Sequence, residues 1–157
     1  MTENVRRLEP GEAVPEISLF DQDGNRVTSE DLAKEPTVLY FFPAAGSPGC
    51  TKEASDFQLR LAEFKERGYR IIGVSPDSVA KLKNFEEAHE LTFTLLSDQE
   101  IEAHKAFGAW GEKSLYGRLY KGVIRSTILI RDGVVVEALY NVKATGHTNM
   151  LLRRIGA

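Results

Sequence analysis

The chain has 157 residues, of which 42% are hydrophobic and 27% are charged. This composition is ordinary for one soluble globular domain spanning residues 1–157, and it excludes a disordered chain. The 20 basic and 23 acidic residues give a net charge of -3 and are scattered, so nucleic acid is not an expected partner. No stretch approaches the ~18 apolar residues of a membrane span. Residues 1–11 contain no apolar segment typical of a secretory signal, and we expect a cytoplasmic protein with no membrane partner.

The order of predicted elements indicates an α/β fold. In chain order we first expect a hairpin over 17–28, a short helix capped by Ser29, a buried strand over 37–42 and a loop over 43–49. One helix then runs from Cys50 to Gly68, followed by a strand over 69–74, a helix around 79–85, a short strand over 92–96 and a helix over 101–107. The chain ends with two strands over 126–130 and 134–140, joined by a turn at 131–133, and a final helix over 147–155. Strands that alternate with helices predict a sheet with helices on both faces.

One cysteine and three histidines limit the chemistry of the chain. A disulfide within the chain or a zinc cage built on cysteines needs a second cysteine, so both are excluded. His89, His104 and His147 lie far apart in the sequence, so no metal site and no cofactor are expected.

Cys50 occupies a position that favours reactivity. It follows a buried strand and a loop rich in proline and glycine, and it begins a predicted helix. Unpaired backbone N–H groups and the positive end of the helix dipole stabilise a thiolate there, and the thiolate is the reactive form. The alternative is an inert buried cysteine, but core cysteines are not usually framed by Pro48, Gly49 and Ser47.

The sequence resembles the peroxiredoxin family. Residues 43–50, PAAGSPGC, match the P-x-x-x-T/S-x-x-C motif of peroxiredoxins, and the longer stretch 40–54 resembles the peroxiredoxin Q, or bacterioferritin comigratory protein, subfamily. Further segments resemble that subfamily in the same order, namely 73–78, 95–98, 110–113, 122–127 and 146–147. The resemblance therefore covers nearly the whole chain.

The resemblance implies a thioredoxin-like fold, with a central mixed sheet flanked by helices and an N-terminal hairpin extension. It also implies a thiol-dependent peroxidase that reduces hydrogen peroxide and organic hydroperoxides. Cys50 would attack the peroxide as a thiolate and become a sulfenic acid. Arg125, the Ser47 hydroxyl and backbone N–H groups would stabilise the leaving oxygen, and Pro43 would limit access of water. Arg125 is far from Cys50 in sequence, and only the fold resemblance places the two together.

Ser55 departs from the family pattern. Many proteins of the subfamily carry a resolving cysteine at this position, and here the chain has no second cysteine. Either the protein is a one-cysteine peroxidase or Ser55 replaces a resolving cysteine. A one-cysteine enzyme needs an outside reductant, either thioredoxin or a small thiol with a glutaredoxin-like protein. The subfamily resemblance also suggests a monomer.

Two other functions compete with the peroxidase. A peroxide sensor would pass the oxidation of Cys50 to a protein partner without efficient turnover. A cysteine hydrolase would need a histidine beside Cys50, and no sequence feature brings one close. Among other candidates, Trp110 and His147 are interpreted as structural, while Glu53 either anchors the helix start or lies on a solvated face.

Overall fold

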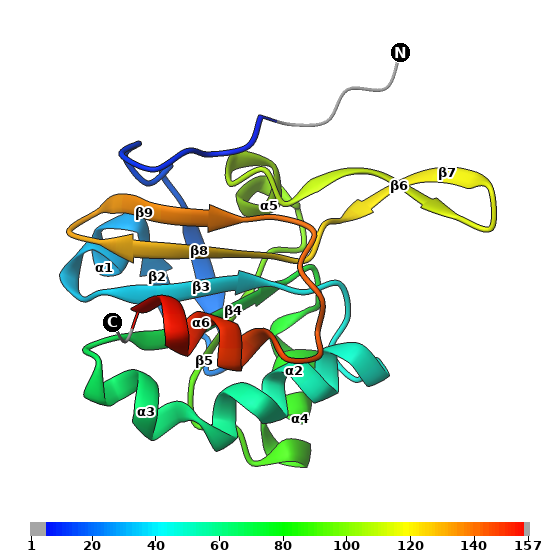
Figure 1. Ribbon diagram of the computed structural model, residues 1–157. Helices are drawn as coiled ribbons and strands as arrows, with labels where there is room; N and C mark the ends of the chain where they lie inside the picture. Colours follow the sequence, from blue (N-terminus) through cyan, green and yellow to red (C-terminus); the bar gives the residue numbers. More distant parts are fainter. Residues whose placement is uncertain (1–5, 156–157) are drawn as a thin grey trace.

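The computed structural model describes residues 6–155 of the chain, except for the side chain of Leu115. Its strands are β1 Ser18–Asp21, β2 Arg26–Thr28, β3 Thr37–Phe41, β4 Arg70–Ser75, β5 Thr94–Ser97, β6 Trp110–Leu115, β7 Arg118–Val123, β8 Ser126–Arg131 and β9 Val134–Leu139. Its helices are α1 Ser29–Lys34, α2 Pro48–Leu59, α3 Leu61–Glu66, α4 Val79–His89, α5 Glu102–Ala106 and α6 His147–Ile155 (Figure 1). Among these residues no helix is both long and apolar enough to cross a membrane.

A mixed sheet forms the centre of the molecule. Its strand order is β2-β1-β5-β4-β3-β8-β9, in which β3, β4 and β5 are parallel and β8 is antiparallel to β3. Every residue of β3 is buried, as expected for a central strand covered on both faces. The β1–β2 hairpin extends the sheet beyond β5, so the expected N-terminal hairpin extension is confirmed.

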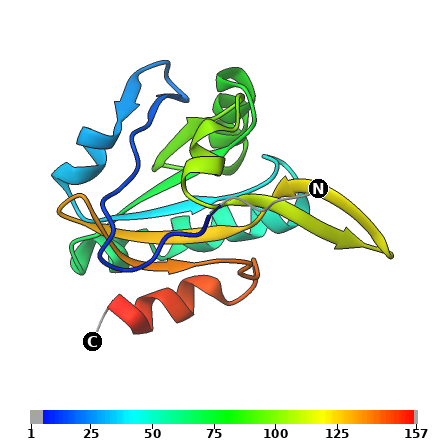
Figure 2. The ribbon, with the colours of Figure 1, turned by 90° about the horizontal axis from the view of Figure 1, so that it is seen from above.

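Helices cover both faces of this sheet, as predicted. One apolar core contains Phe57 of α2, Phe85 of α4 and Leu151 of α6, and the other contains Leu32 of α1 and Ala103 of α5. In Figure 2, α6 (red) lies on one side of the central strands, and α1 (blue) lies on the other. The architecture is the expected α/β arrangement of a thioredoxin-like fold, in which alternating sides of each strand supply the two cores.

Two local expectations were wrong. The N-cap of α1 is Thr28 rather than Ser29, and the Asp31 carboxylate accepts from the Thr28 backbone N–H at 2.8 Å. The helix expected from Cys50 to Gly68 is divided into α2 and α3 at Arg60, whose backbone leaves the helical region. The apolar spacing continues across this break because Leu61 and Phe64 pack into the same core as α2.

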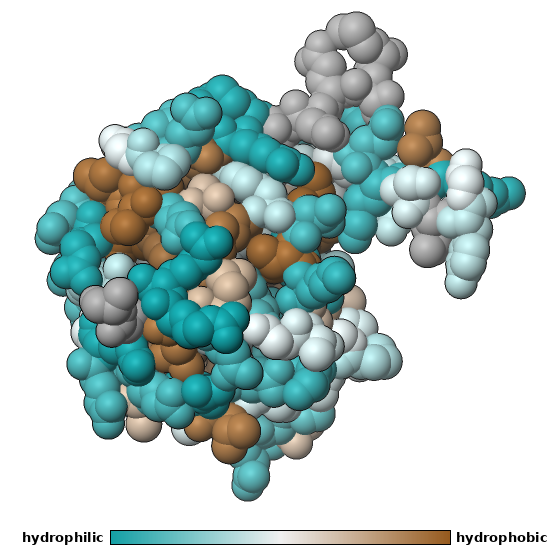
Figure 3. Space-filling view, viewed as in Figure 1, coloured by the Kyte–Doolittle hydropathy of each residue, from teal (hydrophilic) through white to brown (hydrophobic). Residues whose placement is uncertain are grey.

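A two-stranded hairpin, β6–β7, was not expected from the sequence. It pairs Trp110 with Val123 at its base and turns at Tyr116 and Gly117, which both have positive φ. This geometry suits a tight hairpin turn, but the strands lack a clear alternation of apolar and polar residues. In Figure 3 the hairpin stands clear of the body, and the surface is hollowed between the two.

Candidate active site

The candidate site forms where three segments meet at one edge of the sheet. β3 ends at Phe41, α2 begins at Pro48, and Arg125 directly precedes β8. Because Phe41 pairs with Ser126 in the sheet, the residue before β8 lies beside the loop that joins β3 to α2. Figure 1 shows the start of α2 and the base of the β6–β7 hairpin on this same side of the molecule.

Cys50 lies in the first turn of α2, as its sequence position predicted. Ser47 is the N-cap and Pro48 follows it, where a missing N–H costs the helix nothing. The cysteine is buried, with only 1% of its surface exposed. The Nη2 atom of Arg125 donates to its sulfur at 3.5 Å. The cysteine therefore has both a helix N-terminus and a permanent cation within reach.

Arg125 is held from two directions. Its Nη1 donates to Glu53 Oε1 at 2.5 Å, and its backbone carbonyl accepts from the Val142 N–H at 2.9 Å. Its side chain keeps 17% exposure. A Cβ on Gly49 would lie 3.3 Å from Nη2, so a larger residue there would crowd the guanidinium. The family resemblance implied that Arg125 lies beside Cys50, and in the structure the two side chains are in contact.

Glu53 is a site residue whose place the sequence left open between an anchor of the helix start and a solvated face. In the structure its side chain is fully buried and paired with Arg125. Burial raises the pKa of Glu53 to about 7, although the charge of Arg125 and its hydrogen bond oppose the rise. Cys50, Glu53 and Phe57 share one helical face at the spacing i, i+3 and i+7, and this spacing was the available signal.

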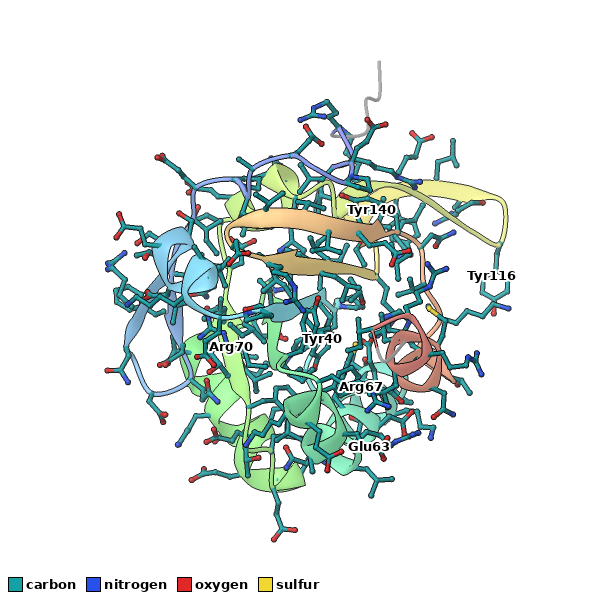
Figure 4. All side chains as sticks on the ribbon, turned by 60° about the vertical axis from the view of Figure 1, so that its left-hand side comes forward. Tyr40, Glu63, Arg67, Arg70, Tyr116 and Tyr140 are labelled. Carbon is teal, nitrogen blue, oxygen red and sulfur yellow. The ribbon has the colours of Figure 1, made fainter. Side chains whose placement is uncertain are left out.

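Tyr40 lies beneath the same cluster. Figure 4 shows it in the interior, between the sheet and the helices. Its ring stacks on Phe57 with the ring centroids 4.5 Å apart, and a Cβ on Gly73 would lie 2.9 Å from its Cζ. Burial, followed by the charges of Glu53 and Cys50, raises the pKa of Tyr40 well above its ordinary value, so its hydroxyl keeps its proton.

Ser47 and Pro43 lie on the loop that leads to Cys50. The Ser47 hydroxyl donates to the Ala44 carbonyl at 3.0 Å, and no hydrogen bond in the described part of the chain joins it to Cys50. Its oxygen therefore keeps lone pairs that can accept from a substrate hydroxyl. Pro43 is half-buried at the start of this loop.

Asp77 holds this loop in place, a role that the sequence did not indicate. Its Oδ2 accepts from the Ala45 N–H at 2.7 Å and from the Ser75 hydroxyl at 2.9 Å. These bonds tie the loop to the end of β4. Trp110, at the base of the β6–β7 hairpin, is half-buried.

None of the three histidines contacts Cys50 through a hydrogen bond in residues 6–155. His147 is nearest the site, where its Nε2 lies 2.7 Å from Thr127 Oγ1. Burial and then the charge of Arg125 lower the pKa of His147 to about 4, so it is neutral near pH 7. His104 pairs with Asp98 at 2.6 Å and His89 is exposed on α4. The histidine base that a cysteine hydrolase requires is therefore not in place among these residues.

The residues brought together suit attack by a cysteine on a polar bond. The cluster offers a sulfur, a guanidinium that contacts it, and the N–H groups of a helix start. Within residues 6–155 no group of three His, Cys, Asp or Glu side chains could hold a metal ion.

Comparison with known proteins places this geometry in a family. Residues 10–138 match the AhpC/TSA family model. A protein of Mycobacterium tuberculosis strain H37Rv, named as a peroxiredoxin, is 49% identical over 148 residues, covering 94% of both chains. Peroxiredoxin Bcp of Escherichia coli K12 is 38% identical over 146 residues, covering 92% of this chain and 94% of its own.

A solved structure agrees with these relatives. The bacterioferritin comigratory protein of Xanthomonas campestris superimposes with a TM-score of 0.85 and 34% identity over 97% of both chains. Each of these proteins is similar to this chain over nearly its full length. The chain therefore belongs to the AhpC/TSA family, as a peroxiredoxin of the bacterioferritin comigratory protein type, an enzyme that reduces hydroperoxides with thiols.

Proposed function

We propose that this peroxiredoxin works through Cys50 alone, and that a thiol from outside the chain completes its cycle. The observation that carries the proposal is the 3.5 Å contact between Arg125 Nη2 and the sulfur of the only cysteine in the sequence. A fixed cation at this distance stabilises the thiolate and then the oxygen that leaves it.

In the first step the Cys50 thiolate attacks the terminal oxygen of a hydroperoxide. An S–O bond forms as the O–O bond breaks, so the sulfur is oxidised to a sulfenic acid and the peroxide is reduced. The leaving alkoxide, or hydroxide when the substrate is hydrogen peroxide, takes up a proton and departs as alcohol or water. Arg125 stabilises the negative charge that develops on it.

Ser47 and Pro43 assist this step from the loop. The Ser47 oxygen accepts the hydrogen of the peroxide and so orients it, because its own proton is already given to Ala44. Pro43, on the same loop, limits the access of water to the Cys50 sulfur. The peroxide enters beside Arg125, which keeps some exposure while Cys50 has almost none.

Both hydrogen peroxide and organic hydroperoxides are proposed substrates. The related Xanthomonas campestris protein is described by its alkyl peroxide reduction activity. The same chemistry at Cys50 acts on any accessible O–O bond.

The second step needs an external thiol. Ser55 is exposed on α2, and no other cysteine exists to form a disulfide within the chain. A small thiol condenses with the sulfenic acid and releases water, and a second thiol, on a glutaredoxin-like protein or thioredoxin, then regenerates Cys50. We further propose that the protein is a monomer and that it acts in the reducing cytoplasm, which fits this cycle.

Mass spectrometry tests the proposal directly. The reduced protein is treated with one equivalent of peroxide, and we expect one added oxygen on Cys50. Addition of a small thiol should then give a mixed disulfide, followed by sustained peroxide consumption when a glutaredoxin-like protein or thioredoxin is present. An unmodified Cys50 would overturn the mechanism. Oxidation without thiol-dependent recycling would instead favour a peroxide sensor that passes the oxidation to a protein partner.

A further inference from the structure

The buried cluster around Cys50 has an excess of acidic groups over cations. Cys50 and Glu53 can each carry a negative charge, and both contact the same guanidinium of Arg125. Both residues are at most 1% exposed, so water screens their charges poorly. Two anions against one cation would leave an uncompensated charge in the interior, which is costly.

The remaining groups near Glu53 do not change this charge balance. The Tyr40 hydroxyl stays protonated because of its burial. His147, which faces Arg125, is neutral near pH 7. Asp56 lies on the same helix, but Lys52 already pairs with its carboxylate at 2.9 Å.

Glu53 also has an oxygen available for a proton. Its Oε1 accepts from Arg125, whereas its Oε2 is buried and, among the described residues, has no hydrogen-bond partner. The Tyr40 hydroxyl is likewise buried without a partner in this part of the chain. An ionised carboxylate with a buried, unsatisfied oxygen is unfavourable, whereas a proton on that oxygen removes the charge.

We propose that Glu53 holds a proton while Cys50 is a thiolate and releases it when Cys50 becomes a sulfenic acid. This inference rests on the proposed function of Cys50. It assigns Glu53 as a positioning residue that acts through Arg125 and not on the peroxide itself.

The step balances in atoms and charge. The Cys50 thiolate, the hydroperoxide and the protonated Glu53 become the sulfenic acid, the alcohol and the ionised Glu53. The alkoxide takes up one proton and Glu53 gives one up, so the solvent supplies none in total. The cluster is neutral before the step, when Arg125 pairs with the thiolate, and neutral after it, when Arg125 pairs with the Glu53 carboxylate.

The reverse change accompanies reduction. When a second thiol displaces the mixed disulfide, its sulfur forms the new S–S bond and Cys50 leaves as a thiolate. The proton that this thiol loses returns to Glu53. The ion pair between Arg125 and Glu53 is therefore strongest in the oxidised enzyme, and Arg125 is most available to the sulfur in the reduced enzyme.

Proton uptake in a single turnover tests the proposal. Reduced enzyme is mixed with one equivalent of hydrogen peroxide in weak buffer with a pH indicator, somewhat below pH 7, and the ultraviolet absorbance of the thiolate is recorded first. The wild type should take up little or no proton, whereas Glu53→Gln should take up roughly one proton per Cys50 oxidised. Equal uptake by both proteins, with Cys50 a thiolate in both, would overturn the proposal. So would a wild type that lacks the thiolate signal, because the proton would then reside on the sulfur.

A matched control is Glu63→Gln. Glu63 also pairs with an arginine, Arg60, at 2.9 Å, but it does so at the surface of α3 (Figure 4). This variant loses an ion pair of the same kind and should behave as the wild type.

An infrared measurement on the wild type keeps the test valid if Glu53→Gln fails to fold. Oxidation of Cys50 should remove the band of one protonated carboxyl group, and a difference spectrum without that loss would refute the proposal. Mass spectrometry of the same samples distinguishes a failure of the proposed peroxidase function from a failure of the proposed role of Glu53. If Cys50 gains no oxygen, the proposed function itself fails, whereas an oxidised Cys50 with full proton uptake overturns only the role of Glu53.

Discussion

The guanidinium of Arg125 donates to the sulfur of Cys50 across 3.5 Å, although 75 positions separate the two residues. The pairing of β3 with β8 produces this contact, because Arg125 precedes β8 and Cys50 follows β3. The planar group also reaches Glu53 with its other nitrogen. One side chain therefore links the reactive sulfur to a buried carboxyl group.

Arg125→Lys should slow peroxide reduction about 100-fold. A lysine carries the charge but has one compact donor group, so it cannot contact the sulfur and Glu53 together as a guanidinium does. Stopped-flow measurement of Cys50 oxidation gives the rate. Alkylation by iodoacetamide is the control, because it needs the thiolate but breaks no O–O bond, and it should slow far less. An equal loss in both reactions would mean that Arg125 only stabilises the thiolate.

Ser47→Ala should slow peroxide reduction about 10-fold, because the peroxide loses an acceptor that orients it. The matched variant is Ser78→Ala. The Ser78 hydroxyl accepts from the Lys81 N–H at 3.2 Å and caps α4, outside the site. Each variant loses one hydroxyl bond to the backbone and about 1 kcal/mol of unfolding free energy. Denaturant titration should therefore show a similar loss of stability for both variants, whereas peroxide kinetics should show a slower rate for Ser47→Ala only. Slow peroxide reduction by Ser78→Ala would contradict the role of Ser47.

His147→Gln should change how the unfolding free energy depends on pH. The pKa of His147 is lowered to about 4 in the folded protein, from an ordinary value of 6.5. Between these values the unfolded chain binds more protons, so the unfolding free energy falls as the pH is lowered from 6.5 to 4. The glutamine amide can bond Thr127 but does not titrate, so this part of the fall, on the order of 3 kcal/mol, should disappear.

Glu53→Gln should show the opposite change in stability. The pKa of Glu53 is raised from 4.5 to about 7 on folding, so the folded protein binds more protons in that window. The unfolding free energy of the wild type therefore loses a contribution as the pH rises from 4.5 to about 7, and the variant should not show this loss. Urea titrations across the window measure both effects. Parallel curves for wild type and variant would show that Glu53 does not titrate there.

Ser55→Cys should permit an internal disulfide after oxidation by peroxide. Ser55 is exposed, whereas Cys50 is buried on another face of the same helix, so the disulfide requires local unwinding of α2. We expect turnover with thioredoxin alone, together with a loss of helical circular dichroism on oxidation. The wild type should turn over poorly with thioredoxin unless a small thiol is present. Robust wild-type turnover with thioredoxin alone would count against the proposed small-thiol step.

Local patterns predicted most of the fold. Most of the strands and helices lie within a few residues of their expected places, and the turn at Asp132 and Gly133 has the positive φ angles that a hairpin needs. The β6–β7 hairpin was missed because four consecutive residues of β7 are exposed and show no period of two. The helix break at Arg60 was missed because apolar spacing continues across it.

The candidate site was predictable only in part. Cys50 could be selected from its place at a helix start, and the family resemblance supplied Arg125, Ser47 and Pro43. The place of Glu53 stayed open because a glutamate on an amphipathic helix is usually solvated, and its partner Arg125 is distant in sequence.

The sequence by itself determined the order of elements, the place of the single cysteine at a helix start, and the absence of a second cysteine to resolve it. These features depend on neighbouring residues and on composition, which a chain carries whether or not it is folded. Only the tertiary structure decided that Arg125 contacts Cys50 and that Glu53 and Tyr40 are buried beneath it. Those contacts arise from the pairing of distant strands and from helix packing, and the low dielectric that raises the pKa of Glu53 exists only once the core has formed.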